Sequence, residues 1–211
     1  GYSIDEMACR LVGAEREPAA AIALARRIKR AVALQVGAFI TCSIGIAPNR
    51  FLAKVASDMQ KPDGLTVIGI QDLPDCLHRL QLIDLPGIGP RMQRRLQRQG
   101  ITTVAQLCAQ TQSQMVALWQ SVLGRYWYRW LRGEDVPDLP THRSSLGHSH
   151  VLPPELRTPQ GAHDVLVRLI HKAAARLRKM HYTAGRLSVH VSQRDWHPWE
   201  AQAALGRCQD T

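Results

Sequence analysis

Residues 85–101 read LPGIGPRMQRRLQRQGI, and this stretch decides how the middle of the chain folds. Gly87 and Gly89 flank Ile88 in a tight turn, and without a Cβ on either glycine the backbone N–H groups can reach a phosphate oxygen. Four arginines and no acid follow: Arg91, Arg94, Arg95 and Arg98. The pattern predicts a helix–hairpin–helix that holds the DNA backbone without reading its sequence. An ordinary corner between two helices is the competing interpretation.

The charge of the whole chain also favours a polyanionic partner. The 211 residues carry a formal net charge of +10, with the excess in residues 71–133 and 141–197. Such an excess raises non-specific affinity for nucleic acid. No apolar run is long enough to span a membrane, so no membrane partner is expected. The five cysteines are widely spaced and form no CxxC pair, which indicates small buried side chains in a reducing, cytoplasmic setting.

Hydrophobic periodicity predicts an α/β layer at the front of the chain. Strands are expected at 2–12, 39–46 and 65–68, and helices after Pro18 and over 49–59. KPDG at 61–64 is a turn by composition. Its Lys61 could reach an anionic substrate, although a lone lysine in a turn is usually just exposed to solvent.

Behind this layer, short helices run from residue 72, and their crowded aromatics indicate a core. Residues 134–142 are acidic and contain two prolines, which is typical of a tether. A strand over 145–152, a helix over 160–181 and a strand over 186–194 follow. The last strand alternates, so Leu187, Val189 and Val191 are predicted to point inward.

Three ordered motifs resemble one known family. SIDE at 3–6, SIGIAPNRFLAKVASDMQKPDG at 43–64 and LPGIG at 85–89 occur in the same order as in the Y-family translesion DNA polymerases of the DinB/UmuC group. The resemblance implies an α+β, multidomain chain and a DNA-directed DNA polymerase that acts in damage tolerance. Its parts would be a partial palm (1–70), a helical thumb with the helix–hairpin–helix (71–136), a linker (137–144) and a partial little finger (145–211).

The resemblance also implies roles for particular residues. Asp5 and Glu6 would be the catalytic carboxylates that bind metal, with two Mg²⁺ ions in the complete enzyme, and Lys61 would contact the triphosphate of a dNTP. The cations would offset the repulsion between adjacent carboxylates. Primer–template DNA would be held by residues of the thumb and the little finger: Gly87, Ile88, Gly89, Arg91, Arg94, Arg95, Ser145, His190 and Arg194. A monomer is expected, and a sliding clamp stays open as a partner.

Departures from the family leave a second function open. The family's palm begins with a strand bearing a third metal-binding Asp, followed by fingers, and neither segment occurs in these 211 residues. The chain is therefore expected to be a fragment that does not polymerise alone. The alternative is a non-catalytic DNA-binding accessory protein that keeps the thumb and the little finger. A zinc site at His148 and His150 is disfavoured, because no third ligand has suitable spacing.

Overall fold

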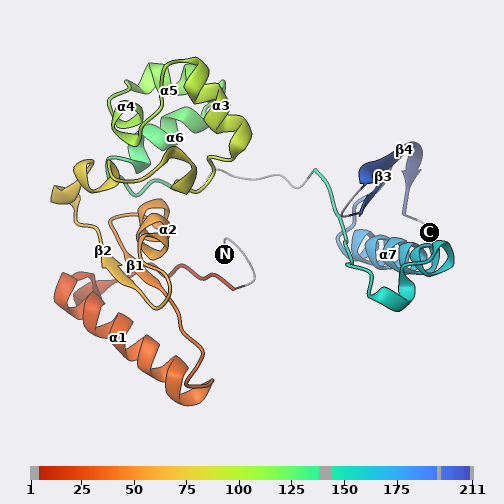
Figure 1. Cartoon of the computed structure of the whole chain (residues 1–211), viewed down its shortest axis with the longest axis horizontal. Coiled ribbons are helices and arrows are strands. Elements are labelled where there is room, and N and C mark those ends of the chain that lie inside the picture. Colours follow the sequence, from red (N-terminus) through yellow and green to blue (C-terminus); the bar gives the residue numbers. More distant parts are fainter. Residues whose placement is uncertain (1–4, 138–143, 194–195, 210–211) are drawn as a thin grey trace. The chain divides into compact units, whose positions relative to one another are not determined.

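The computed structural model describes residues 5–137, 144–193 and 196–209, and it divides into two compact units, Gly1–Asp138 and Leu139–Thr211 (Figure 1). Helices and short sheets occur in both units, as an α+β chain requires. Most of the expected linker falls on residues 138–143, which lie outside the described residues. No helix in the described part of the chain is long and apolar enough to cross a membrane.

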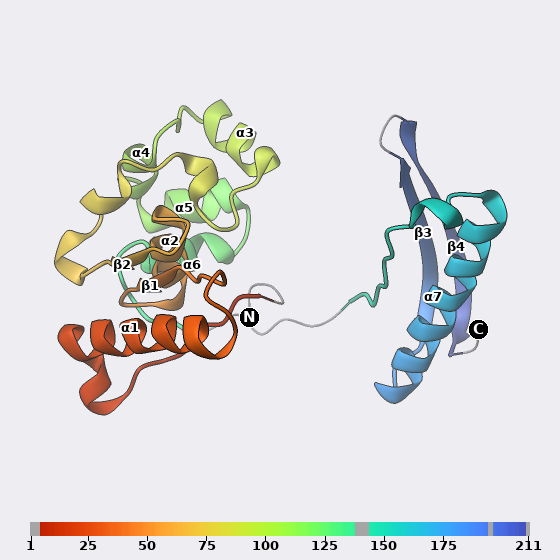
Figure 2. The same cartoon turned by 60° about the horizontal axis from the view of Figure 1, so that its bottom comes forward.

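The first unit begins with a small α/β layer. A 3₁₀ turn η1 (Gly13–Arg16) leads into α1 (Pro18–Gln35), which starts with proline at its first position, where no N–H is needed. The strands β1 (Ile44–Ile46) and β2 (Leu65–Val67) pair in parallel, Ile44 opposite Leu65. Between them runs α2 (Arg50–Met59), and Figure 2 shows α1 and α2 on opposite sides of this strand pair.

Two strand predictions in this region are wrong. Residues 5–12, the described part of the strand expected at 2–12, are irregular up to η1. The strand expected at 39–46 shrinks to residues 44–46. In both cases the residue types suit a strand, but strand pairing depends on a partner that the local sequence does not specify.

Seven short helices follow: η2 (Ile70–Asp72), η3 (Asp75–Leu77), η4 (Leu82–Asp84), α3 (Pro90–Arg98), α4 (Val104–Cys108), α5 (Gln112–Trp119) and α6 (Leu123–Trp130). Thr103 and Thr111 cap α4 and α5 by accepting N–H bonds from Gln106 and Gln114. As predicted, the aromatics form a core: Trp127 is buried and contacts both Phe51 of α2 and Trp119 of α5.

One hydrophobic core therefore joins α2 to the short helices. The apolar face of α2 is buried in it through Phe51, Leu52, Val55 and Ala56. Buried Asn49 fixes the same junction, since its Oδ1 caps α2 at Leu52 N–H and its Nδ2 donates to the carbonyls of Trp130 and Glu134. The two halves of the first unit are thus packed as one body.

The second unit contains η5 (Pro154–Leu156), α7 (Pro159–Lys179), β3 (Ala184–Gln193) and β4 (Trp196–Cys208). β3 and β4 form an antiparallel hairpin, in which His190 is opposite Glu200. The helix agrees with the prediction, but residues 145–152 form no strand. Leu187 and Val191 remain 37% and 43% exposed, so the predicted inward face is covered only in part, because two strands and one helix supply little to bury it.

Candidate nucleotide and nucleic-acid interface

Asp5 and Glu6 lie in the extended segment that precedes η1. Glu6 is brought to α2, where its Oε1 lies 2.6 Å from Nζ of Lys54. Glu6 is half-buried and Asp5 is exposed. A contact between residues 48 positions apart places the first acidic motif beside the second motif of the sequence.

Lys54 belongs to a larger group of charges at the end of α2. Its Nζ lies 2.9 Å from Asp58 Oδ2, and Nζ of Lys61 lies 2.7 Å from Asp58 Oδ1. Glu6, Lys54, Asp58 and Lys61 therefore alternate in charge and form what we call the charge chain. The sequence analysis selected Glu6 and Lys61 and missed Lys54 and Asp58. The i, i+4 spacing of Lys54 and Asp58 is nevertheless that of a helical ion pair.

The pKa values in the charge chain follow from these contacts. Burial alone would lower the pKa of Lys54, but hydrogen bonds with Glu6 and Asp58 outweigh burial and raise it above its ordinary value. Burial would raise the pKa of Asp58, but hydrogen bonds with Lys61 and Lys54 lower it instead. Lys54 is thus held as a cation and Asp58 as an anion.

The chemistry of Asp5 and Glu6 suits a hard divalent cation. Mg²⁺ is usually held by one or two carboxylates, with substrate phosphate and water completing its octahedron. In the described part of the chain, no three His, Cys, Asp or Glu side chains cluster as a metal site would require. The two carboxylates can therefore supply part of a donor set, and the rest must come from other groups.

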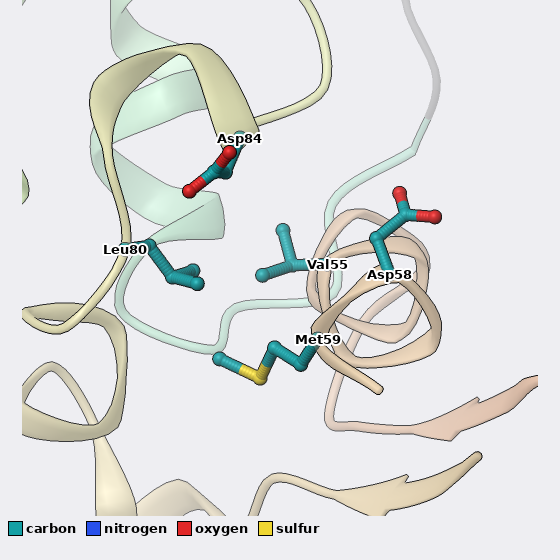
Figure 3. A pocket seen from close by; sticks show the side chains of 5 residues that line it. All are labelled: Val55, Asp58, Met59, Leu80 and Asp84. Carbon is teal, nitrogen blue, oxygen red and sulfur yellow. The ribbon is translucent and has the colours of Figure 1, made fainter. Parts of the chain in front are cut away.

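A cavity of about 410 Å³ lies beside the charge chain, between α2 and the segment around η4 (Figure 3). Val55, Met59 and Leu80 turn apolar side chains toward one another, while Asp58 and Asp84 place carboxylates at its edge. This composition does not attract a phosphate group. Lys54 and Lys61 bring ammonium groups to this region, where both are paired with the carboxylate of Asp58.

The glycine hairpin forms as predicted, although the element before it, η4, is only one turn of 3₁₀ helix. Gly87 has φ +101°, a value that side-chain-bearing residues rarely adopt, and Ile88 anchors the turn with 3% exposure. Gly89 is the N-cap of α3 and makes no side-chain cap bond. The first N–H groups of α3 therefore need an outside acceptor, which suits an anion.

The predicted arginines lie along α3, from Arg91 in its first turn to Arg95 in its last, and all are exposed. Arg94 donates to the carbonyl of Pro90 at 3.3 Å, and Arg95 makes a long contact of 3.5 Å with the carbonyl of Leu118. Arg91 lies in the first turn, beside the hairpin. Arg91, Arg94 and Arg95 have i, i+3 and i+4 spacing and so share one face of α3, which together with the hairpin we call the hairpin surface.

The remaining predicted DNA contacts fall in the second unit. Ser145 is exposed in an irregular segment, and His190 is exposed on β3. Glu200 lies across from His190 in the hairpin, so an acidic residue stands next to this predicted DNA contact. Arg194 lies outside the described residues.

Three family models match the chain in order. The impB/mucB/samB family matches residues 1–58, the thumb domain of DNA polymerase-iota matches 83–135, and the C-terminal domain of the impB/mucB/samB family matches 143–211. The two impB/mucB/samB matches alone cover more than half of the chain. The chain belongs to the Y-family DNA polymerases, in the DinB-like group. This family is in general metal-dependent.

Individual relatives agree with this family. A DNA polymerase IV of Moorella thermoacetica is 32% identical over 214 residues, which is 100% of this chain and 53% of the relative. A DNA polymerase IV of Staphylococcus aureus is 29% identical over 205 residues, covering 96% of this chain and 57% of the relative. The chain thus spans about half the length of these Y-family relatives.

A solved structure supports the fold of the Y-family chain. A Y-family DNA polymerase chimera of Dbh and Dpo4 superposes with a TM-score of 0.60 and 26% identity. The match covers 89% of this chain and 53% of the chimera.

Proposed function

We propose that this chain carries out part of template-directed nucleotidyl transfer in a translesion DNA polymerase. The observation that carries the proposal is the charge chain, in which Glu6 of the first motif contacts Lys54 of the second motif, and Asp58 links Lys54 to Lys61. Nucleotidyl transfer requires both charges at one place, carboxylates for a cation and ammonium groups for phosphate. The relatives named DNA polymerase IV support this function over that of an accessory protein.

Each residue of the site has a proposed role. Asp5 and Glu6 would hold Mg²⁺ together with the phosphates of a bound dNTP, and Lys61 would contact the triphosphate. Bound Mg²⁺ would activate the primer hydroxyl and stabilise the charge of the leaving pyrophosphate. Lys54 lies between Glu6 and Asp58 and would balance their charge before substrate binds.

Primer–template DNA is the proposed partner of the hairpin surface. Gly87, Ile88, Gly89 and the three arginines at 91, 94 and 95 would hold phosphates. Ser145, His190 and Arg194 would contact the backbone from the second unit. We keep the division into palm (1–70), thumb (71–136), linker (137–144) and little finger (145–211) as part of this proposal. A monomer in the cytoplasm is proposed, with a sliding clamp as a candidate partner.

The 211-residue chain alone is expected to be inactive. It offers two carboxylates at the proposed metal site, and a two-metal site with an incomplete donor set positions its ions poorly. A primer-extension assay with Mg²⁺ and four dNTPs should give no extended product. Extension by this chain would show that Asp5 and Glu6 suffice.

DNA binding tests the proposal without requiring catalysis. Affinity for a fluorescent primer–template duplex should fall steeply with salt, because each phosphate contact adds about 0.9 to the slope of log K against log salt. Replacing Arg91, Arg94 and Arg95 with Ala should lower the slope by about 2–3. The matched control removes three exposed charges from α7, Arg168, Lys172 and Arg176, and should change the slope by less than about 1. Equal losses from both triple variants would contradict a specific role of the hairpin.

A further inference from the structure

Lys29 of α1 lies in an unusual setting for a surface lysine. Its side chain is 19% exposed, and its ammonium lies among four oxygen atoms. Nζ donates to the carbonyl of Cys42 at 2.7 Å, to the carbonyl of Asp63 at 2.8 Å and to Asp63 Oδ1 at 2.5 Å, and it lies 3.4 Å from the carbonyl of Gly64. An ammonium has three N–H donors, so these acceptors satisfy it completely.

Three of the four oxygens belong to the turn at 61–64, the segment that carries Lys61. Two of them are backbone carbonyls directed at Lys29, and the backbone of Asp63 has φ +57°, the left-handed conformation that most residues avoid. Without the ammonium, the carbonyl of Asp63, at an exposed contact, and the carbonyl of Gly64, at a partly buried one, would both lose a charged hydrogen-bond partner, which costs more than the loss of a neutral one. Lys29 thus stabilises the shape of the turn.

The turn is also fixed on its other sides. A Cβ at Gly64 would lie 1.9 Å from the carbonyl oxygen of Gln60, so the turn packs directly on the end of α2. Gly64 N–H donates to Ser43 Oγ at 3.1 Å, and its carbonyl accepts from Ile44 N–H at 3.0 Å. Lys29 is the one side chain among these contacts that brings a full positive charge to the turn from α1.

The position of Lys61 depends on this turn. Lys61 begins the turn, and its Nζ reaches Asp58 on α2. A shift of the backbone at 61–64 would move the Lys61 ammonium relative to the charge chain. A displacement of about 1 Å is enough to weaken the contact between a charged group and a phosphate.

We infer that Lys29 is a positioning residue for nucleotide binding: by holding the 61–64 turn from α1, it sets where Lys61 meets the triphosphate. This inference rests on the proposed contact between Lys61 and nucleotide. Lys29 itself touches no substrate. It acts through the backbone of Asp63 and Gly64.

The test uses the full 211-residue chain and two readouts. The affinity for dATP with Mg²⁺ is measured by titration calorimetry, and the exchange of backbone amides around the turn is measured by hydrogen–deuterium exchange. Lys29→Met keeps the aliphatic stem and removes the charge, and Lys29→Arg restores a charge. Arg30→Met, at an exposed position next to Lys29, is the matched control for the loss of one positive charge.

The expected result separates these variants. Lys29→Met should bind dATP about five- to tenfold more weakly, as the loss of a charged hydrogen-bond group predicts. Its backbone amides around the turn should also exchange hydrogen for deuterium faster than those of the wild type. Lys29→Arg should recover part of the affinity, and Arg30→Met should match the wild type within about twofold. If Lys29→Met does not fold, Lys29→Gln, which keeps an N–H donor and removes the charge, replaces it and should weaken binding in the same direction.

The contradicting results are distinct from each other. Wild-type affinity in Lys29→Met, with or without faster exchange, would overturn the positioning role while leaving the proposed function intact. Equal losses of dATP affinity in Lys29→Met and Arg30→Met would show that net charge alone explains the effect, and would also overturn the positioning role. No dATP binding by the wild-type chain would instead overturn the proposed nucleotide site, and the inference with it.

Discussion

At the scale of single residues, Gly87 and Gly89 differ although they share one hairpin. Gly87 has φ +101°, and an added Cβ would lie 3.3 Å from the Trp127 ring, whereas Gly89 has φ −89° and open space. Gly87→Ala should lower the free energy of unfolding by about 1–2 kcal/mol and weaken DNA binding. Gly89→Ala should cost about 0.5 kcal/mol. Denaturant titration and DNA anisotropy measure both effects, and equal costs would contradict the hairpin geometry.

Cys108 gives a prediction about pH. Burial raises the pKa of its thiol from 9.0 to about 11. Because the pKa is higher in the folded chain than in the unfolded chain, the protonated thiol contributes to the free energy of unfolding. This contribution is fully present below pH 9 and is lost as the pH rises through 11. Between pH 8 and pH 10.5 the wild type should therefore lose about 1–2 kcal/mol more unfolding free energy than Cys108→Ala. Parallel urea titrations measure this difference, and identical pH dependence in both proteins would contradict the burial of the thiol.

The thiols also differ in accessibility. Cys9 is exposed, contrary to the expectation that the cysteines are buried, and Cys108 is buried. An alkylating reagent at pH 8 should modify Cys9 in the folded chain, and Cys108 only after unfolding. Peptide mass spectrometry distinguishes the two sites. Rapid labelling of Cys108 in the native chain would show that the core around α4 opens.

At the scale of elements, α2 joins the proposed nucleotide site to the proposed DNA surface. Its polar face carries Lys54 and Asp58, and its apolar face packs on the helices that support the hairpin. Asn49→Ala would remove the cap of α2 and one donor from each of two carbonyls, of which that of Trp130 keeps Gly133 N–H, so a loss of about 2–4 kcal/mol in the free energy of unfolding is expected. Thr111→Ala removes an exposed cap alone and should cost about 1 kcal/mol. Thermal and urea denaturation provide the comparison, and similar costs would contradict the bridging role of Asn49.

The elements that the sequence predicted best are those with local signals. Asn49 followed by a run of apolar residues at helical spacing defines α2, and two glycines with arginines define the hairpin. The strands expected at 2–12 and 145–152 failed because their residues suit a strand but no partner pairs with them among the described residues. The contact of Lys29 with the turn spans 34 positions, and no local pattern marks it.

At the scale of the whole molecule, the net charge of +10 is distributed over two units. The first unit combines the charge chain and the hairpin surface on one hydrophobic core, so the proposed substrate and DNA contacts would share one support. The second unit adds basic residues on a helix and a two-stranded sheet. Family membership was evident in the sequence from three ordered motifs. The link between Glu6 and Lys61 through Lys54 and Asp58 required the folded chain.

The most direct test of the central claim is the Mg²⁺ dependence of nucleotide binding. Calorimetric titration of dATP into the chain, with Mg²⁺ and with EDTA, should show tighter binding with Mg²⁺. In Glu6→Gln, the ratio of dATP affinity with Mg²⁺ to dATP affinity with EDTA should be at least about tenfold smaller than in the wild type, because an amide holds the cation less strongly than a carboxylate. Asp75→Asn, which changes a side chain 91% exposed and outside the charge chain, should retain it. Equal dATP affinity with Mg²⁺ and EDTA, or an unchanged gain in Glu6→Gln, would contradict the account.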